Sequence, residues 1–212
     1  MPALYLASKS PRRKQILEAM GIRDLEIVHA GPAMLTAFEG DEIQHAGESA
    51  EDYVIRTASD KARQAMARIR SLAAAPAPIL AADTVVICNG EILGKPVDRE
   101  QARAFLQRLS GRTHEVRTAV AVSDGHSDEL HVAVSISQVT FARLSSGQIE
   151  SYVQTEEPYD KAGGYAVQGL AAVFIERIEG SYSGIMGLPV FETARLLSQV
   201  APQLLPACAR TD

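Results

Sequence analysis

The sequence predicts an α/β protein, because apolar strand patterns and amphipathic helix patterns alternate along it. A short apolar segment, residues 4–7, is followed directly by a helix that begins at Pro11. Residues 79–88 are apolar on both faces of a strand, which is typical of a strand buried inside a sheet. Residues 116–122 and 132–141 alternate as an antiparallel ribbon, with a shift of phase in the second strand that predicts a β-bulge.

Two of the predicted helices begin with recognisable caps. Ser10 is expected to cap the helix that begins at Pro11, and Ser49 is expected to cap a second helix with Asp52 at its third position. On a helical wheel Lys61 falls within the apolar stripe of the second helix. Its stem either snorkels along the core or directs the ammonium inward, towards phosphate.

The buried strand over residues 79–88 carries a carboxylate, Asp83, at its centre. Desolvating a carboxylate costs several kcal/mol unless it has a partner. Asp83 therefore either caps a backbone N–H at a bulge, or is held on a rigid strand to bind a metal or accept a proton. Asn89-Gly90 predicts a tight hairpin, and Lys95 on the returning strand would bring a positive charge near Asp83.

Bulk composition excludes several classes of function. A formal charge of −5 argues against a general nucleic-acid binder, and no apolar run is long enough to span a membrane. Cys88 and Cys208 lie far apart, as expected of a protein in the reducing cytoplasm rather than one built on disulfides. The five histidines lack the spacing of metal ligands.

Cations are concentrated at the start of the first predicted helix: Lys9, Arg12, Arg13 and Lys14. The helix dipole already makes this end positive, so the cluster is unfavourable by itself. It is either a solvated basic turn or a phosphate cradle of Ser hydroxyls, N–H groups and guanidinium groups.

Two loops carry further polar groups. Residues 30–48 contain Glu39, Asp41, Glu42 and Glu48. These acids are either solvated, or one of them joins Asp83 around a cation. Residues 157–169 are predicted to form a glycine-rich loop that contains Gln168. A polar side chain on such a loop is more typical of a ligand-binding site than of a hydrophobic core.

Five segments in unbroken order resemble the Maf family of nucleoside triphosphate pyrophosphatases. They are LASKSPRR from Leu6, ADTVV from Ala82 with GKP from Gly94, LSGRTH from Leu109, DKAG from Asp160 through to Gln168-Gly169, and GSY from Gly180 with GLP from Gly187. The resemblance implies an elongated mixed sheet flanked by helices, of the Maf and ITPase-like kind, with two lobes and a central cleft. It also implies a single domain over residues 1–201 and a homodimer in the cytoplasm. Residues 202–212, at the end of the chain, are expected to be a flexible tail.

The same resemblance implies hydrolysis of the α–β phosphoanhydride of nucleotides, with Mg²⁺ or Mn²⁺ as the divalent cofactor. Asp83 matches the proton acceptor and, with Glu42, the expected metal ligands; Glu39 and Asp41 are alternatives to Glu42. The residues that match positions around the triphosphate are Ser8, Arg13, Lys61 and Lys95.

Positions that separate branches of the family carry Arg12, Thr84 and Gln168, a combination that resembles the branch acting on dTTP and UTP. An amide offers both a donor and an acceptor to a pyrimidine edge. Two further functions remain open at this point. One is a nucleotide-binding regulator of septum formation with little catalysis, and the other is removal of modified pyrimidine nucleotides in house-cleaning. The partner is in each case a small nucleotide, with no nucleic acid and no membrane.

Overall fold

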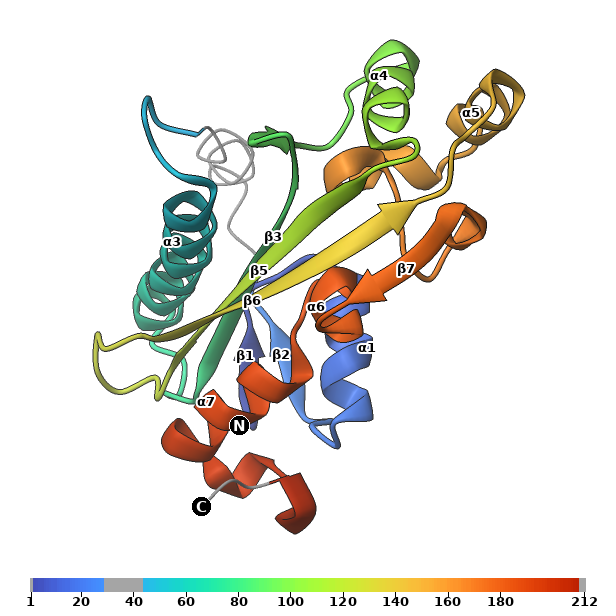
Figure 1. The fold of residues 1–212 in the computed structure, drawn as a ribbon. Helices are drawn as coiled ribbons and strands as arrows, with labels where there is room; N and C mark the ends of the chain where they lie inside the picture. Colours follow the sequence, from blue (N-terminus) through green and yellow to red (C-terminus); the bar gives the residue numbers. More distant parts are fainter. Residues whose placement is uncertain (1, 29–43, 210–212) are drawn as a thin grey trace. The chain divides into compact units, whose positions relative to one another are not determined.

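A computed structural model describes residues 2–28 and 44–209 and confirms the α/β class. Seven strands form one mixed sheet in the order β2-β1-β3-β5-β6-β7, with β4 paired to β3 (Figure 1). The strands are β1 (Leu4–Leu6), β2 (Leu25–Ile27), β3 (Ile79–Cys88), β4 (Glu91–Leu93), β5 (Thr113–Ser123), β6 (His131–Phe141) and β7 (Ile175–Glu179). β1 runs parallel to β2 and β3, whereas the β3–β4 and β6–β7 pairs are antiparallel.

Helices alternate with these strands in sequence, as predicted, and the last helices follow β7. The α-helices are α1 (Pro11–Ala19), α3 (Ala50–Ser71), α4 (Arg99–Leu109), α5 (Ser146–Val153), α6 (Tyr182–Met186) and α7 (Val190–Val200). Short 3-10 helices are η1 (Glu157–Asp160), η2 (Ala162–Gly164), η3 (Leu170–Phe174), η4 (Pro202–Leu204) and η5 (Ala207–Ala209). Within the described ranges, no helix combines the length and the apolar character needed to cross a membrane.

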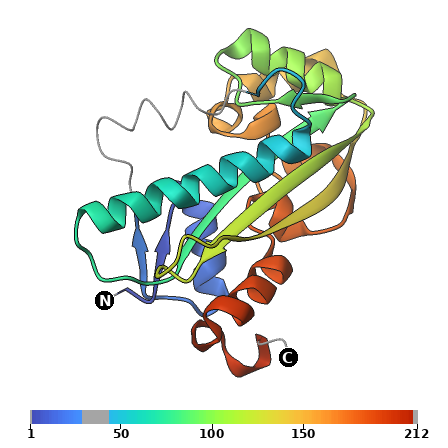
Figure 2. The ribbon, with the colours of Figure 1, turned by 90° about the vertical axis from the view of Figure 1, so that its left-hand side faces the viewer.

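The chain divides into two compact units. Unit 1 comprises residues 1–83, 119–134 and 187–212. In it, α1 and α3 cover opposite faces of the parallel strands β1 and β2 and the first half of β3 (Figures 1 and 2). Leu205 is buried in the segment expected to be a tail, and that segment contains η4 and η5.

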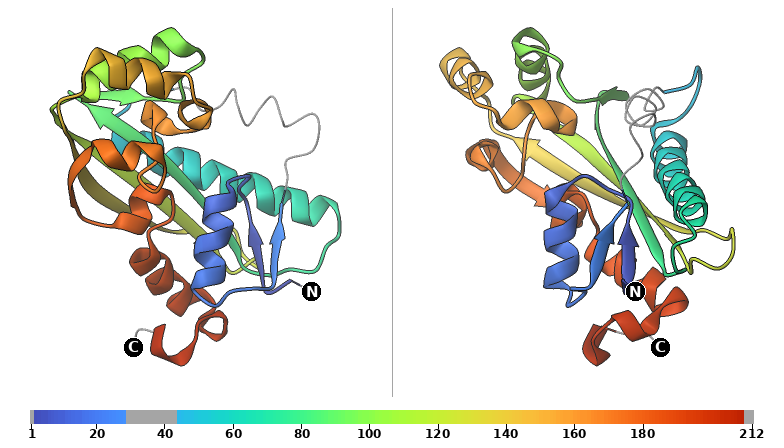
Figure 3. Two further views of the ribbon diagram at one scale, coloured as in Figure 1. Left: turned by 90° about the vertical axis from the view of Figure 1, so that its right-hand side faces the viewer. Right: turned by 180° about the vertical axis from the view of Figure 1, so that it is seen from behind.

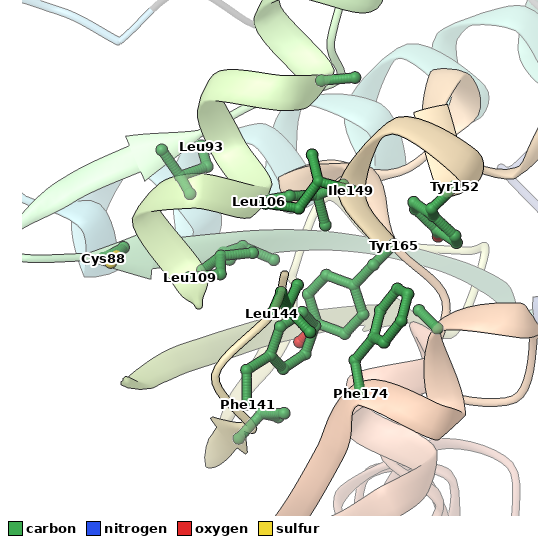
Figure 4. Packing of buried hydrophobic residues seen from close by; sticks show 14 of the residues in the cluster. Cys88, Leu93, Leu106, Leu109, Phe141, Leu144, Ile149, Tyr152, Tyr165 and Phe174 are labelled. Atoms are coloured by element: carbon green, nitrogen blue, oxygen red, sulfur yellow. The ribbon is translucent and has the colours of Figure 1, made fainter. Parts of the chain in front are cut away.

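Unit 2 comprises residues 84–118 and 135–186, and has a hydrophobic core of its own. Helices α4 and α5 lie side by side in it (Figure 3), joined by the Arg103–Glu150 ion pair. Figure 4 shows how Leu106, Tyr165 and Phe174 converge in the core from three different parts of the chain.

Local sequence signals explain most element boundaries. The Ser49 hydroxyl accepts a hydrogen bond from Asp52 N–H, and Asp98 caps α4 in the same way through Gln101 N–H. The predicted hairpin is confirmed, since Asn89 and Gly90 have φ of 53° and 80° and β4 begins one residue later. Because β4 ends at Leu93, Lys95 lies beyond the returning strand rather than on it.

The predicted phase shift inside β6 is wrong. Burial alternates without interruption from Ala133 through Ser135 and Ser137 to Phe141, so polar serines face inward while Ile136 is half exposed. The register shift lies between Thr140 and Phe141, opposite β7. The apolar pattern gave the wrong phase because a serine can be buried in this strand: Ser137 Oγ accepts a hydrogen bond from Ser181 N–H at 3.0 Å.

A buried histidine lies in the core of unit 2. His114 Nε2 is 2.7 Å from the Tyr165 hydroxyl, and the two rings, with Phe141, pack edge to face. Burial lowers the pKa of His114 to about 4. In the described part of the chain Nδ1 has no hydrogen-bond partner, so a second ring proton would be a buried donor without an acceptor.

This histidine makes stability depend on pH. Its pKa is near 6.5 when unfolded and lower when folded, so between these values the unfolded chain binds more protons. The stabilisation is therefore complete above the unfolded pKa and is lost as pH falls towards the folded pKa. We expect wild-type unfolding free energy, measured in urea, to fall by about 2 kcal/mol from about pH 7 to about pH 5 through this residue.

The matched control is the double variant His114→Phe/Tyr165→Phe, which removes both polar partners and keeps both rings. Its unfolding free energy should change less with pH over the same window than that of the wild type. Equal pH dependence of the two proteins would show that His114 is not responsible.

Candidate active site

Asp83 lies in β3 on a buried stretch of the strand, and its carboxylate is tied to helix α3 at both oxygens. Lys61 Nζ lies 2.6 Å from Oδ1, and Thr57 Oγ1 lies 2.7 Å from Oδ2. The side chains of Lys61 and Asp83 are only 12% and 11% exposed, so this is a largely desolvated ion pair. The interpretation of Asp83 as a backbone cap at a bulge is not what the structure shows.

Helix geometry explains how one carboxylate meets two partners. Thr57 and Lys61 are four residues apart on α3, so their side chains lie on the same face one turn apart. Thr57 is buried on that face, and the Lys61 ammonium reaches Asp83, so Lys61 is directed inward rather than snorkelling outward. Lys61 thereby places beside Asp83 the positive charge that the sequence analysis expected from Lys95.

Thr57 is a site residue that the sequence analysis missed. Its hydroxyl lies 2.9 Å from Tyr53 O, 3.2 Å from Val54 O and 2.7 Å from Asp83 Oδ2. It has one proton to donate, and the charged carboxylate is both the nearest and the strongest acceptor. The spacing of four from Lys61 was the signal that could have found it.

The start of α1 brings two more expected residues together. Arg13 donates from Nη1 to Ser8 Oγ at 3.1 Å and from Nε to Gly187 O at 2.8 Å. Ser10 occupies the N-cap position but its side chain makes no capping bond; instead its N–H donates to Ser8 Oγ at 3.2 Å. The predicted N-cap position of Ser10 is therefore confirmed, but without a capping side-chain bond, because Ser8 Oγ accepts from both the Ser10 N–H and Arg13.

The other cations at this helix end do not all act alike. Lys14 pairs with Glu18 one turn further on, at 3.7 Å. Lys9 is exposed, and Arg12, like Arg13, is partly buried. Of the four cations, Arg13 is therefore the one that the structure ties to Ser8.

In unit 2, Thr84 is part of a chain of hydroxyl groups. Thr84 Oγ1 lies 2.9 Å from Thr118 Oγ1, which lies 2.8 Å from Gly184 O. Since Thr118 has one proton and the carbonyl can only accept, both contacts are hydrogen bonds only if Thr84 donates to Thr118. Thr118 is a further residue that sequence reasoning did not identify.

Lys95 and Gln168 are exposed and lie on loops of unit 2. Gly94 O accepts from Gly163 N–H at 2.9 Å, so the segment before Lys95 is fixed to η2. Gln168 lies in a turn closed by the bond from Gly169 N–H to Ala166 O.

The expected metal ligands are only partly described. Glu42 lies outside the described residues, as do Glu39 and Asp41. Within residues 2–28 and 44–209 no three His, Cys, Asp or Glu side chains form a metal-binding group. Asp83 is a hard oxygen ligand and retains lone pairs beyond its two bonds. The described residues thus fit an ion that draws most ligands from phosphates and water, as Mg²⁺ usually does.

The Thr57 bond makes a prediction about stability. Thr57→Val keeps the shape but leaves Asp83 Oδ2 without this donor, so we expect unfolding free energy to fall by about 1–3 kcal/mol. Urea denaturation followed by circular dichroism measures the loss.

Thr193→Val is a matched control in the same unit, on α7. Thr193 is fully buried, and in the part of the chain that the structure describes its hydroxyl has no hydrogen-bond partner. The same chemical change should here be neutral or stabilising. Equal losses in the two variants would show that the Thr57–Asp83 bond contributes nothing.

Comparison with known proteins places this arrangement in a family. Residues 3–200 match the family described as "Maf-like protein". Curated relatives named "dTTP/UTP pyrophosphatase" come from Bordetella avium (51% identical), Cupriavidus pinatubonensis (50%) and Burkholderia pseudomallei (48%). Each match covers 92% of this chain and, in the same order, 94%, 96% and 92% of the relative.

A solved structure titled "The structure of the Staphylococcus aureus Ham1 protein" aligns with 81% of this chain and 90% of its own, at a TM-score of 0.41 and 14% identity. That likeness is too weak to carry an argument. The family match spans nearly the whole chain and includes the strand of Asp83, the helix of Lys61 and the turn of Gln168. The chain belongs to the Maf family.

Proposed function

We propose that the protein hydrolyses the α–β phosphoanhydride of nucleoside triphosphates, releasing a nucleoside monophosphate and pyrophosphate, with dTTP and UTP preferred. The observation that carries the proposal is the buried Asp83–Lys61 pair at the centre of a core strand. The names of the relatives at about half identity support the same reaction and the same bases.

Asp83 is the proton acceptor for the attacking water in this proposal. The water oxygen attacks phosphorus while a proton of the water passes to the Asp83 carboxylate. The bridging P–O bond then breaks, and pyrophosphate leaves with the electron pair of that bond. General-base help of this kind is worth about 10²–10⁴-fold. Thr57 and Lys61 hold both oxygens of the carboxylate, so the base is oriented before substrate arrives.

Cations of the site neutralise the phosphate chain. The Lys61 ammonium has three donors, so it can hold Asp83 and a phosphate oxygen together. Ser8 and Arg13 form a hydroxyl–guanidinium pair at the start of a helix, which is a favourable place for phosphate. Lys95 adds a further charge.

We include Mg²⁺ or Mn²⁺ in the proposal, held by Asp83 and Glu42. When bound, such an ion neutralises charge that builds up on the phosphate oxygens. The proposal also assigns Arg12, Thr84 and Gln168 to recognition of the base, because a Gln amide can pair with both the N–H and the carbonyl of uracil or thymine.

The setting of the reaction is proposed as well. We infer a cytoplasmic homodimer that acts on free nucleotides and not on nucleic acid or membranes. Two free cysteines, Cys88 and Cys208, support a reducing compartment, and the net charge of −5 is unfavourable for binding polyanions in general.

We expect Asp83→Asn to fold and to lower kcat for pyrophosphate release from UTP by about 10²–10⁴-fold. The Asn carbonyl can still accept from Lys61 but is too weak a base to take the proton. Asp98→Asn is the control, because Asn caps a helix as well as Asp does and Asp98 lies at the start of α4. Near wild-type release by Asp83→Asn would remove Asp83 from the mechanism.

A panel of common and modified triphosphates, scored by kcat/KM for pyrophosphate release, tests the substrate class. We expect dTTP and UTP, or modified pyrimidine forms of them, to exceed purine nucleotides. UTP binding without pyrophosphate release under saturating Mg²⁺ or Mn²⁺ would instead indicate a regulator.

A further inference from the structure

The Glu157 carboxylate in unit 2 accepts three hydrogen bonds and lies outside the proposed machinery. Oε1 accepts from the Tyr152 hydroxyl at 2.8 Å and from Ala171 N–H at 3.0 Å, and Oε2 accepts from Leu170 N–H at 2.7 Å. Two of these donors are the first backbone N–H groups of η3, which begins two residues after Gln168. The carboxylate thus holds the backbone just after Gln168.

Gly169 brings the chain directly against this carboxylate. A Cβ at residue 169 would lie 2.2 Å from Glu157 Oε2 and 2.5 Å from Cδ, which is far inside any contact distance. A side chain at residue 169 would therefore have to displace the Glu157 carboxylate from the donors that hold it. Residue 169 is the immediate neighbour of Gln168, so its position limits where Gln168 can lie.

The other end of the turn is fixed in a different way. Tyr165 is buried and bonded to His114, and Ala166 and Val167 are also buried. The bond from Gly169 N–H to Ala166 O closes the turn, with exposed Gln168 inside it. Gln168 thus extends an exposed side chain from a backbone that is held at both ends.

The surroundings of the Glu157 carboxylate favour its ionised form. Burial is the largest effect on the pKa of Glu157 and raises it, but bonds from Ala171 N–H, Leu170 N–H and Tyr152 together outweigh it and leave that pKa lowered. Burial and the neighbouring carboxylate raise the pKa of Tyr152, which keeps its hydroxyl a donor. Lys161 Nζ donates to Glu157 O at 2.9 Å, adding a positive charge nearby.

We propose that Glu157 is a positioning residue that fixes the Gln168 turn for recognition of the pyrimidine base. The inference rests on the proposed function, because it takes Gln168 to read the base of dTTP or UTP. Glu157 acts through the backbone of residues 169–171 and does not itself touch the nucleotide.

This role predicts which kinetic constant changes. If the turn loosens, the Gln168 amide that is proposed to pair with the base is misplaced. The chemistry is assigned to Asp83 and Lys61, which belong to β3 and α3 and are bonded to each other. Loss of one such bond is worth about tenfold in binding. The effect should therefore appear in KM and in discrimination between UTP and CTP, whose bases present opposite donor and acceptor groups at positions 3 and 4.

The test compares four proteins: wild type, Glu157→Gln, Gln168→Ala and the double variant. In Glu157→Gln the new amide can replace only one carboxylate oxygen, because its NH₂ group faces an N–H donor. We expect Glu157→Gln to raise KM for UTP by about tenfold, with kcat within about twofold, and to lower the UTP-to-CTP ratio of kcat/KM. In the Gln168→Ala background it should add little, since both changes remove one interaction.

Glu150→Gln is the matched control. Glu150 also forms a two-point bond, to Arg103, but this pair joins α5 to α4 and does not reach the turn. Its KM and kcat should stay at wild-type values. Full additivity of Glu157→Gln with Gln168→Ala, or an unchanged KM for UTP in Glu157→Gln, would overturn the inference.

A second measurement keeps the inference testable if Glu157→Gln folds poorly. Gly169→Ala should be destabilising in the wild type, because the new methyl would displace the carboxylate from its hydrogen bonds. In Glu157→Ala the same change should cost much less, since the carboxylate is gone. Equal losses in unfolding free energy in both backgrounds would show that residues 157 and 169 are not coupled.

A failure of the proposed function can be told apart from a failure of this inference by a different result. If the wild type releases no pyrophosphate from any triphosphate, the reaction is wrong, and the same four proteins are compared by UTP affinity in titration calorimetry. Parallel, non-additive losses of affinity for Glu157→Gln and Gln168→Ala would still support Glu157 as the anchor. Unchanged affinity would overturn it.

Discussion

The desolvated carboxylate of Asp83 is the constraint on which the unit 1 site depends. A charge in the middle of a core strand would cost several kcal/mol if unpaired, and removal of one partner from such a pair is strongly destabilising. Lys61 and Thr57 offset that cost from one face of α3, so the helix has to pack on β3 in one register. The same two bonds that make the burial tolerable also orient the carboxylate, so stability and readiness for catalysis have one origin.

In unit 2, polar side chains are held by both backbone and side-chain hydrogen bonds. Glu157 is satisfied by the start of η3 and by Tyr152, and Thr84 by a hydroxyl chain that ends on Gly184 O. In each case a residue proposed to read the base lies within or beside a closed set of hydrogen bonds. A proposed recognition loop that exposes Gln168 is thereby given a rigid backbone, which reduces the entropy lost when a ligand binds.

At two places, hydrogen bonds of serine side chains differ from what the local sequence pattern predicted. Ser10 has the position of a cap, yet Ser8 accepts its N–H and the Arg13 guanidinium together. Inward-facing Ser135 and Ser137 keep β6 in one phase where the apolar pattern predicted a shift, and the register shift lies later, between Thr140 and Phe141. In both places a hydroxyl found partners that a local rule does not consider, and those partners decided how the backbone is held.

The sequence by itself determined the α/β alternation, the Asn89-Gly90 hairpin, the cap at Ser49, and the place of Lys61 on the inner face of its helix, because each depends on a local period or turn rule. Its motifs also determined the family. Tertiary structure alone decided that Lys61 pairs with Asp83, that Thr57 shares this carboxylate, and that Glu157 holds the turn of Gln168. Those contacts join residues 13 to 26 positions apart, and only packing of α3 on β3, or of η3 on η1, brings such atoms within hydrogen-bonding distance.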